Sequence, residues 1–133
     1  MDKFSKSILE QILYNFPELI YDHNKESAFL ELEIPTQNIS SIGGLIIQTT
    51  TEKDIWIRNN HPFSAYLVDT TEELITIIKG VLTNKILRVI ACMDGEWVET
   101  TLIKEGSDVH KENGMTYTIL CWSGTSDRSF KME

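Results

Sequence analysis

Apolar side chains recur every four residues near the start of the chain, at Phe4, Ile8, Ile12 and Phe16. This period places them on one face of an amphipathic helix, which we predict over residues 3–15. Pro17 ends this helix, because a proline inside a helix removes a backbone donor and clashes with the previous turn. A second helix is predicted after Thr70, whose side chain can cap the helix start while Glu73 reaches back as in a capping box.

Between the two helices the period changes to alternation, which is typical of strands with one buried side. Strands are predicted over residues 27–34, 44–51, 55–59 and 63–68. The last three are separated by short segments rich in turn-forming residues, so they predict an antiparallel meander.

The pattern after the second helix is again that of strands, predicted over residues 86–93, 96–103 and 115–122. The first of these is almost continuously apolar, as expected of a central strand covered on both faces. Asp94-Gly95 suits a tight type I′ turn between the first two of these strands. Residues 104–114 are predicted to form a loop, and the tail after the last strand is expected to fray. The element order predicts an α+β fold, with one antiparallel sheet of about six or seven strands and both helices packed on one face.

The length of 133 residues and the 41% hydrophobic content suit a single domain, residues 1–133, with one core. No apolar stretch reaches the roughly 18 residues of a membrane span, and the polar, charged start does not resemble a secretory signal. We therefore expect a cytoplasmic protein with no membrane partner. Twelve Lys and Arg against twenty Asp and Glu give a net charge of -8, which disfavours nucleic acid as a partner and favours a basic protein.

Cysteines and histidines give no metal-site signal. Cys92 and Cys121 each lie in an apolar run, so we expect buried, reduced thiols, although a disulfide between neighbouring strands stays open. His23, His61 and His110 are isolated in predicted turns or loops, and no second ligand stands at metal-ligand spacing. We predict no metal and no cofactor.

No catalytic motif is complete. Neither Ser41 nor Ser123 lies in a GxSxG elbow between a strand and a helix. Gly43 and Gly44 precede a strand, so they lack the helix N-terminus that makes a phosphate cradle. We therefore predict no catalytic residues and a protein that is not an enzyme.

Strand alternation instead predicts a binding face. Glu31 and Glu33 point away from the core on one strand, and Trp56 and Arg58 do so on another. Tryptophan and arginine are enriched among the residues that dominate binding energy, so this composition is typical of a protein-binding surface. The alternative is that Trp56 packs beneath a loop or a helix. With His61 at the mouth of a hairpin, the predicted partner-binding residues are Glu31, Glu33, Trp56, Arg58 and His61.

Three segments of the chain combine a hairpin with an HPF turn, a capped helix and a DGxW hairpin: GGLIIQTTTEKDIWIRNNHPFSAYLVDTTEELITIIKGVLTNKI, MDGEWVETTLI and CWSGTSD. In this general pattern the chain resembles the small acidic immunity proteins encoded beside polymorphic and contact-dependent toxins in bacteria. The resemblance implies a non-enzymatic protein with no catalytic residues. It would bind and neutralise a cognate toxin domain, often a basic nuclease, inside the producing cell.

The leading interpretation is therefore an immunity-type protein that occludes the active site of a basic toxin, since negative charge speeds association with such a partner. One alternative is a small enzyme or ligand-binding domain with a pocket near His61 or His110, which a deep pocket beside a carboxylate would favour. A second alternative is a phage or structural-assembly component, marked by an obligate homo-oligomer with a large apolar interface. The oligomeric state is left open.

Overall fold

The computed structural model describes residues 1–35, 44–59, 65–107, 111–123 and 127–132. In chain order the elements are α1 (Lys3–Asn15), β1 (Asp22–His23), β2 (Glu31–Ile34), β3 (Leu45–Thr49), β4 (Ile55–Arg58), β5 (Tyr66–Val68), α2 (Thr71–Leu82), β6 (Ile86–Met93), β7 (Glu96–Lys104), β8 (Met115–Leu120) and β9 (Arg128–Lys131). The α+β class is confirmed. The helix over residues 3–15, the meander and the hairpin around Asp94-Gly95 are all present.

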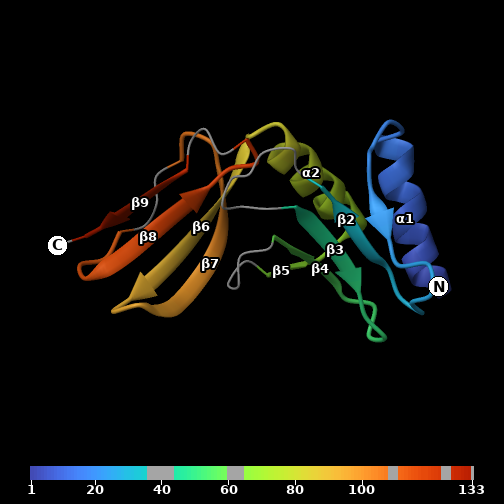
Figure 1. The fold of residues 1–133 in the computed structure, drawn as a ribbon, viewed down its shortest axis with the longest axis horizontal. Helices are drawn as coiled ribbons and strands as arrows, with labels where there is room; N and C mark the ends of the chain where they lie inside the picture. The colour runs from blue at the N-terminus through green and yellow to red at the C-terminus, as the bar shows by residue number, and fades with distance from the viewer. Residues whose placement is uncertain (36–43, 60–64, 108–110, 124–126, 133) are drawn as a thin grey trace.

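The strands form two antiparallel sheets, whereas the sequence predicted one. Within the described ranges there are nine strands, ordered β1-β2-β3-β4-β5 in a five-stranded sheet and β7-β6-β8-β9 in a four-stranded sheet. The two sheets lie toward opposite ends of the long axis of the molecule, with α2 between them in the chain (Figure 1). Alternation reveals which side of a strand is buried but not which strand it pairs with, so the sequence pattern could not divide the strands between sheets.

Two of the strands were not predicted at all. β1 has two residues, which is too short to display a period, and it pairs with β2. β9 lies in the tail that we expected to fray, but it pairs with β8 along its whole length. Phe130 of β9 contacts Tyr117 of β8, with ring centroids 5.5 Å apart, and this aromatic contact holds the tail on the sheet.

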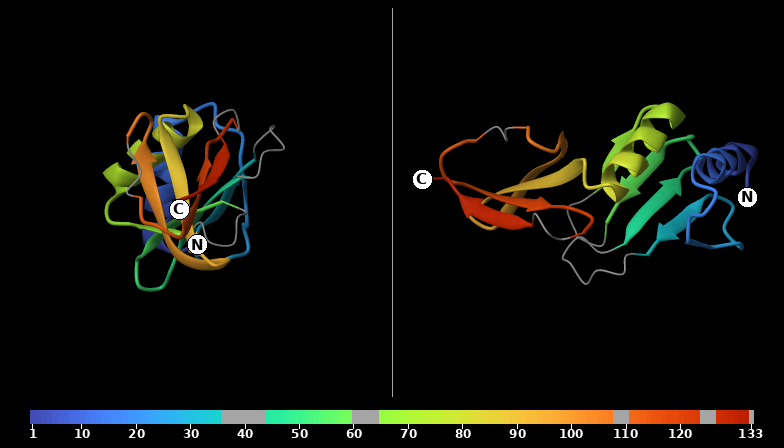
Figure 2. Two further views of the ribbon diagram at one scale, coloured as in Figure 1. Left: turned by 90° about the vertical axis from the view of Figure 1, so that its left-hand side faces the viewer. Right: turned by 90° about the horizontal axis from the view of Figure 1, so that it is seen from above.

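Both helices cover one face of the five-stranded sheet, as predicted (Figure 2). Asp2 caps α1 by accepting the Ser5 N–H at 2.8 Å, and Thr70 caps α2 by accepting the Glu73 N–H at 3.1 Å. The core between helices and sheet contains the alternate strand residues and the apolar helix faces: Ile8, Ile12, Leu30, Leu32, Ile34, Leu45, Ile47, Ile55, Ile57, Val68, Leu74, Ile77, Ile78 and Val81.

A buried polar contact fixes α1 on the sheet. Ser5 is fully buried, and its Oγ lies 2.6 Å from Oγ1 of Thr49 at the end of β3. The same Thr49 oxygen accepts the Leu30 N–H at 2.8 Å, just before β2 begins. One hydroxyl therefore joins the first helix to β3 and to the start of β2.

The four-stranded sheet has its own apolar cluster, formed by Leu87, Val89, Ala91, Met115, Tyr117, Ile119 and Cys121. β6 lies between β7 and β8, which confirms the predicted central position. Asp94 and Gly95 both have positive φ, at 52° and 81°, as a type I′ turn requires. The β6–β7 pairing contains a bulge. Ala91 stands opposite Glu99 and Cys92 opposite Trp97, so Val98 is an extra residue of β7 without an opposite residue on β6.

The two cysteines are far apart in the strand register. Cys92 stands opposite Thr116, whereas Cys121 follows the end of β8. Cys121 is buried as predicted, but Cys92 is only half-buried, because it lies near the end of β6 on the side away from the Cys121 cluster. The register separates them by five positions along β8, so no disulfide joins them.

The junction between α2 and β6 is closely packed. A side chain at Gly80 would meet Ile86, because the added Cβ would overlap the Cδ1 atom of that residue. Asn84 adopts a φ of 59°, and its side-chain oxygen accepts the Ser123 N–H at 2.9 Å. Trp122, just after β8, packs against the core between the helices and the five-stranded sheet. This contact holds the end of β8 against that core.

Candidate partner-binding face

The five-stranded sheet has one face under the helices and one that faces away from them, which we call the open sheet face. Directly opposed residues of antiparallel strands point to the same side, so the register identifies its members. One cross-strand row is Glu31, Gln48, Trp56 and Leu67, and the other is Asp22, Glu33, Ile46 and Arg58. These eight residues come from all five strands of the sheet.

Four of the five residues predicted for partner binding lie together on this face. Glu31 and Glu33 are exposed, and the buried residues of β2 alternate with them. Trp56 and Arg58 are half-buried, whereas Ile55 and Ile57 between them are buried in the core. His61 lies outside the described residues, and so does His110.

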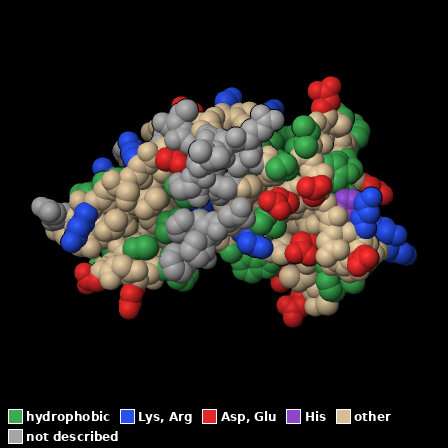
Figure 3. Space-filling view, in the orientation of Figure 1, with side chains coloured by type: hydrophobic (Ala, Val, Ile, Leu, Met, Phe, Trp, Pro, Cys, Tyr) green, Lys and Arg blue, Asp and Glu red, His purple; other side chains and the backbone are tan. Residues whose placement is uncertain are grey.

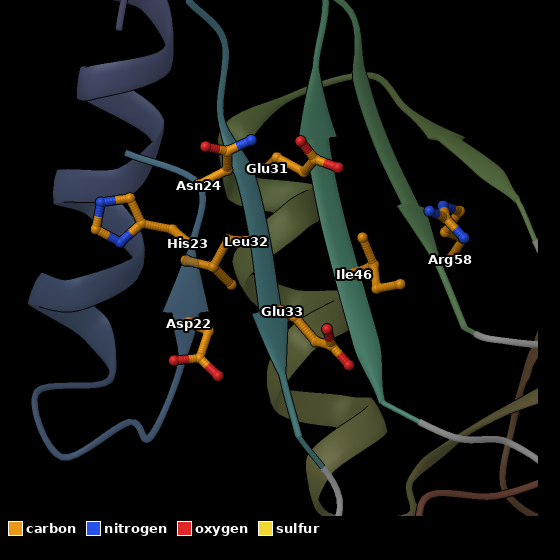
Figure 4. A pocket seen from close by; sticks show the side chains of 8 residues that line it. All are labelled: Asp22, His23, Asn24, Glu31, Leu32, Glu33, Ile46 and Arg58. Atoms are coloured by element: carbon orange, nitrogen blue, oxygen red, sulfur yellow. The ribbon is translucent and has the colours of Figure 1, made fainter. Parts of the chain in front are cut away.

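An open hollow of about 320 Å³ lies across β1, β2 and β3. Figure 4 shows the carboxylates of Asp22, Glu31 and Glu33 around it, with Arg58 on the β4 side. Ile46, which is 9% exposed, supplies the apolar lining, whereas the Leu32 side chain faces the core. Three carboxylates and an apolar surface match the aliphatic stem and cationic head of a lysine or arginine side chain.

Two negative charges stand opposite one another on the open sheet face. Asp22 and Glu33 stand directly opposite one another, and like charges in that position destabilise a sheet. Arg58 Nε donates to Gln48 Oε1 at 3.1 Å, which orients the guanidinium along its own side of the face. A cationic group from outside would relieve the repulsion between the two carboxylates.

The other end of the open sheet face is apolar. Leu67 is 44% exposed, and it stands opposite the half-buried Trp56. An exposed leucine beside a tryptophan offers a partner an apolar anchor, next to the acidic end formed by β1 and β2. The face therefore combines an acidic end and an aromatic end within one sheet.

Most of the net negative charge lies in residues 1–83, the part of the chain that carries this face. Residues 1–83 contain twelve of the twenty acidic residues but only six of the twelve basic ones. Figure 3 shows many acidic side chains over the part of the molecule formed by the five-stranded sheet. The field around the open sheet face is therefore negative.

Among the residues that the structure describes, Asp2, Tyr66 and Arg88 have shifted pKa values. Hydrogen bonds from Ser5 lower the pKa of the capping Asp2 carboxyl. Burial raises the pKa of the Tyr66 hydroxyl, which also donates to Glu73 Oε1 at 3.3 Å. Burial lowers the pKa of Arg88 to about 10, so this guanidinium keeps its charge at neutral pH. None of the three lies on the open sheet face.

Sequence reasoning missed half of the face: Asp22, Ile46, Gln48 and Leu67. Alternation within the predicted strands could have found Ile46, Gln48 and Leu67, because each lies between two core-facing positions of its own strand. Asp22 gave no signal, because β1 is too short. His23, expected in a turn or loop, instead lies in β1 and stacks on Tyr21 with ring centroids 5.7 Å apart.

No group of three or more His, Cys, Asp or Glu side chains suited to a metal ion occurs among the residues that the structure describes. Neither described helix is both long enough and apolar enough to cross a membrane. In comparisons with known proteins, no family model, curated protein or solved structure matched the chain.

Proposed function

We propose that the protein is an immunity-type protein, which binds a cognate basic toxin domain through the open sheet face and occludes the toxin's active site. The observation that carries this proposal is the gathering of Glu31, Glu33, Trp56 and Arg58 on one sheet face beside an acidic hollow. The toxin as partner comes from the resemblance to immunity proteins. The basic character of the partner is supported by the net charge of -8.

Binding would use the two ends of the face differently. A lysine or arginine side chain of the partner would enter the hollow and contact the carboxylates of Asp22, Glu31 and Glu33. Apolar side chains of the partner would cover Trp56 and Leu67. The long-range charge would steer the encounter, and the aromatic end would slow dissociation.

The experiment is co-expression with the product of the neighbouring gene in bacteria. We expect the two proteins to co-purify and growth to be protected. The double variant Glu31→Lys with Glu33→Lys should lose both effects, because it places two cations in the hollow. The matched control is Glu10→Lys with Glu18→Lys, which makes the same change in net charge at exposed positions of α1 and the turn after it.

The two double variants separate the possible outcomes. If the control protects growth and the hollow variant does not, the open sheet face is the binding surface. Loss of protection by both variants to the same degree would leave only net charge as the cause and would contradict the proposed face. A neighbouring product that never binds and is not toxic would contradict the immunity function itself.

A further inference from the structure

Arg58 is the only positively charged residue among the eight that form the open sheet face. It ends the cross-strand row that begins with Asp22, Glu33 and Ile46. On β4 it follows Trp56 by two positions, and residues two apart on a strand point to the same side. A partner that covers Trp56 therefore covers Arg58 as well.

Among the residues that the structure describes, no carboxylate pairs with the guanidinium of Arg58. Its Nε donates to Gln48 Oε1 at 3.1 Å, and this acceptor is an uncharged amide. Ile46 stands between Arg58 and Glu33 in the cross-strand row (Figure 4). Two strand spacings, roughly 10 Å, therefore separate β4 at Arg58 from β2 at Glu33.

The bond with Gln48 uses only one edge of the guanidinium. A guanidinium has two edges, and each can donate two parallel N–H bonds to a carboxylate. Nε belongs to the edge that Gln48 holds. The other edge consists of Nη1 and Nη2, and no residue in the described ranges accepts from it. This edge has the geometry that a carboxylate takes in a bidentate pair.

We propose that the partner presents an aspartate or glutamate carboxylate to Arg58, beside the cationic side chain that enters the acidic hollow. This inference rests on the proposed function and names a second charged group of its partner. Covering Arg58 takes water from a cation, and a charge that loses its water without gaining an opposite charge weakens binding. The partner surface is therefore bipolar, with its base over Asp22 and Glu33 and its acid over Arg58.

The sign of one substitution separates this arrangement from a uniformly basic partner surface. A uniformly basic surface repels Arg58, so removing its charge would tighten binding. A partner carboxylate attracts Arg58, so removing its charge would weaken binding. Arg58→Gln makes the distinction, because glutamine keeps N–H donors on a long side chain but has no positive charge.

The measurement is stopped-flow association and dissociation of the full chain with the product of the neighbouring gene, at fixed salt. We expect Arg58→Gln to weaken affinity about tenfold through faster dissociation, because a covered charge pair acts on that rate. Association should stay as fast as in the wild type or become slightly faster, because the variant is more acidic. Arg58→Lys keeps the charge but cannot donate two parallel bonds, so its dissociation rate should lie between those of the wild type and Arg58→Gln.

The matched control is Arg128→Gln, which removes the same charge at an exposed position of β9 and should leave the dissociation rate unchanged. Thermal melting checks the folding of each variant. The dissociation rate is a property of the complex alone, so a smaller folded fraction does not change it. If Arg58→Gln does not fold, Arg58→Met, which also removes the charge from a long side chain, takes its place with the same expected result.

An Arg58→Gln protein that binds as tightly as the wild type, or more tightly, would overturn the inference. The proposed function would still stand in that case if Glu31→Lys with Glu33→Lys loses binding. Equal acceleration of dissociation by Arg128→Gln would also overturn the inference, because the effect would not belong to the open sheet face. A neighbouring product that does not bind the wild type would contradict the proposed function and this inference with it.

Discussion

Replacing Thr49 by Val removes a hydroxyl that joins α1 to two strands while nearly conserving the shape of the side chain. In the native structure Thr49 Oγ1 accepts the Leu30 N–H at 2.8 Å and lies 2.6 Å from Ser5 Oγ. Thr49 is 6% exposed and Ser5 fully buried, so water does not readily replace the lost oxygen. The variant leaves the Leu30 N–H and the Ser5 hydroxyl without the Thr49 oxygen that both contact.

The magnitude follows from these two groups. A buried N–H that loses its acceptor costs about 1–3 kcal/mol, and the loss of the Ser5 contact adds about 1 kcal/mol. The extra methyl of valine offsets about 1 kcal/mol through burial. We therefore expect Thr49→Val to lower the free energy of unfolding by about 1–3 kcal/mol. Ser5→Ala should lower it by about 1 kcal/mol or less, because Thr49 keeps its bond with the Leu30 N–H.

Equilibrium unfolding in urea measures both variants, with an unchanged dependence on denaturant as the check that the unfolded state is the same. The comparison between the variants matters more than either value alone. A Thr49→Val protein as stable as the wild type would refute the reasoning. So would a Ser5→Ala protein that loses as much stability as Thr49→Val, because the main-chain donor would then carry none of the effect.

Further predictions concern the binding face, the junction and the first helix cap. Trp56→Ala should weaken partner binding by about 2 kcal/mol or more, measured by calorimetry, with little change in the thermal midpoint; Trp97→Ala on the other sheet is the control. Gly80→Ala should destabilise the fold by about 1 kcal/mol despite the better helix propensity of alanine, because the added Cβ meets Ile86. In a protein that already carries Ile86→Ala, adding Gly80→Ala should cause no further loss of stability. A further loss relative to the Ile86→Ala variant would contradict the contact. The lowered pKa of Asp2 means that its carboxylate adds stability above pH 3.8 and loses it as the pH falls through the folded value. Asp2→Asn caps the helix without titrating, so the stability advantage of the wild type over this variant should shrink below pH 3.8; an advantage that is constant down to pH 2 would contradict the cap.

Local signals in the sequence predicted the local structure well. Pro17 follows α1, Thr70 caps α2, and Asp94-Gly95 forms the turn that its residue types favour, because each depends on a few adjacent residues. Helix propensity alone marks Gly80 as a weak point of α2. Only the packing of Ile86 against it shows why a larger residue does not fit.

The pairing of distant strands could not be predicted, because it depends on residues that are far apart in the sequence. Alternation placed Glu31 and Trp56 on the outer sides of their strands, and both do lie on the open sheet face. It could not show that Asp22 stands opposite Glu33, because β1 has only two residues. The division into two sheets and the link between Ser5 and Thr49 depend on contacts distant in sequence, about which periodicity carries no information.

The most direct test of the proposed binding face is the rate at which the purified protein associates with the product of the neighbouring gene, measured by stopped flow at low and physiological salt. We predict fast association that slows markedly as salt rises, because charges farther apart than roughly 8 Å are screened at physiological ionic strength. Glu10→Lys with Glu18→Lys should retain most of this rate, whereas Glu31→Lys with Glu33→Lys should associate slowly at both salt concentrations. Equal rates for the two double variants, or a wild-type rate that is indifferent to salt, would contradict the account.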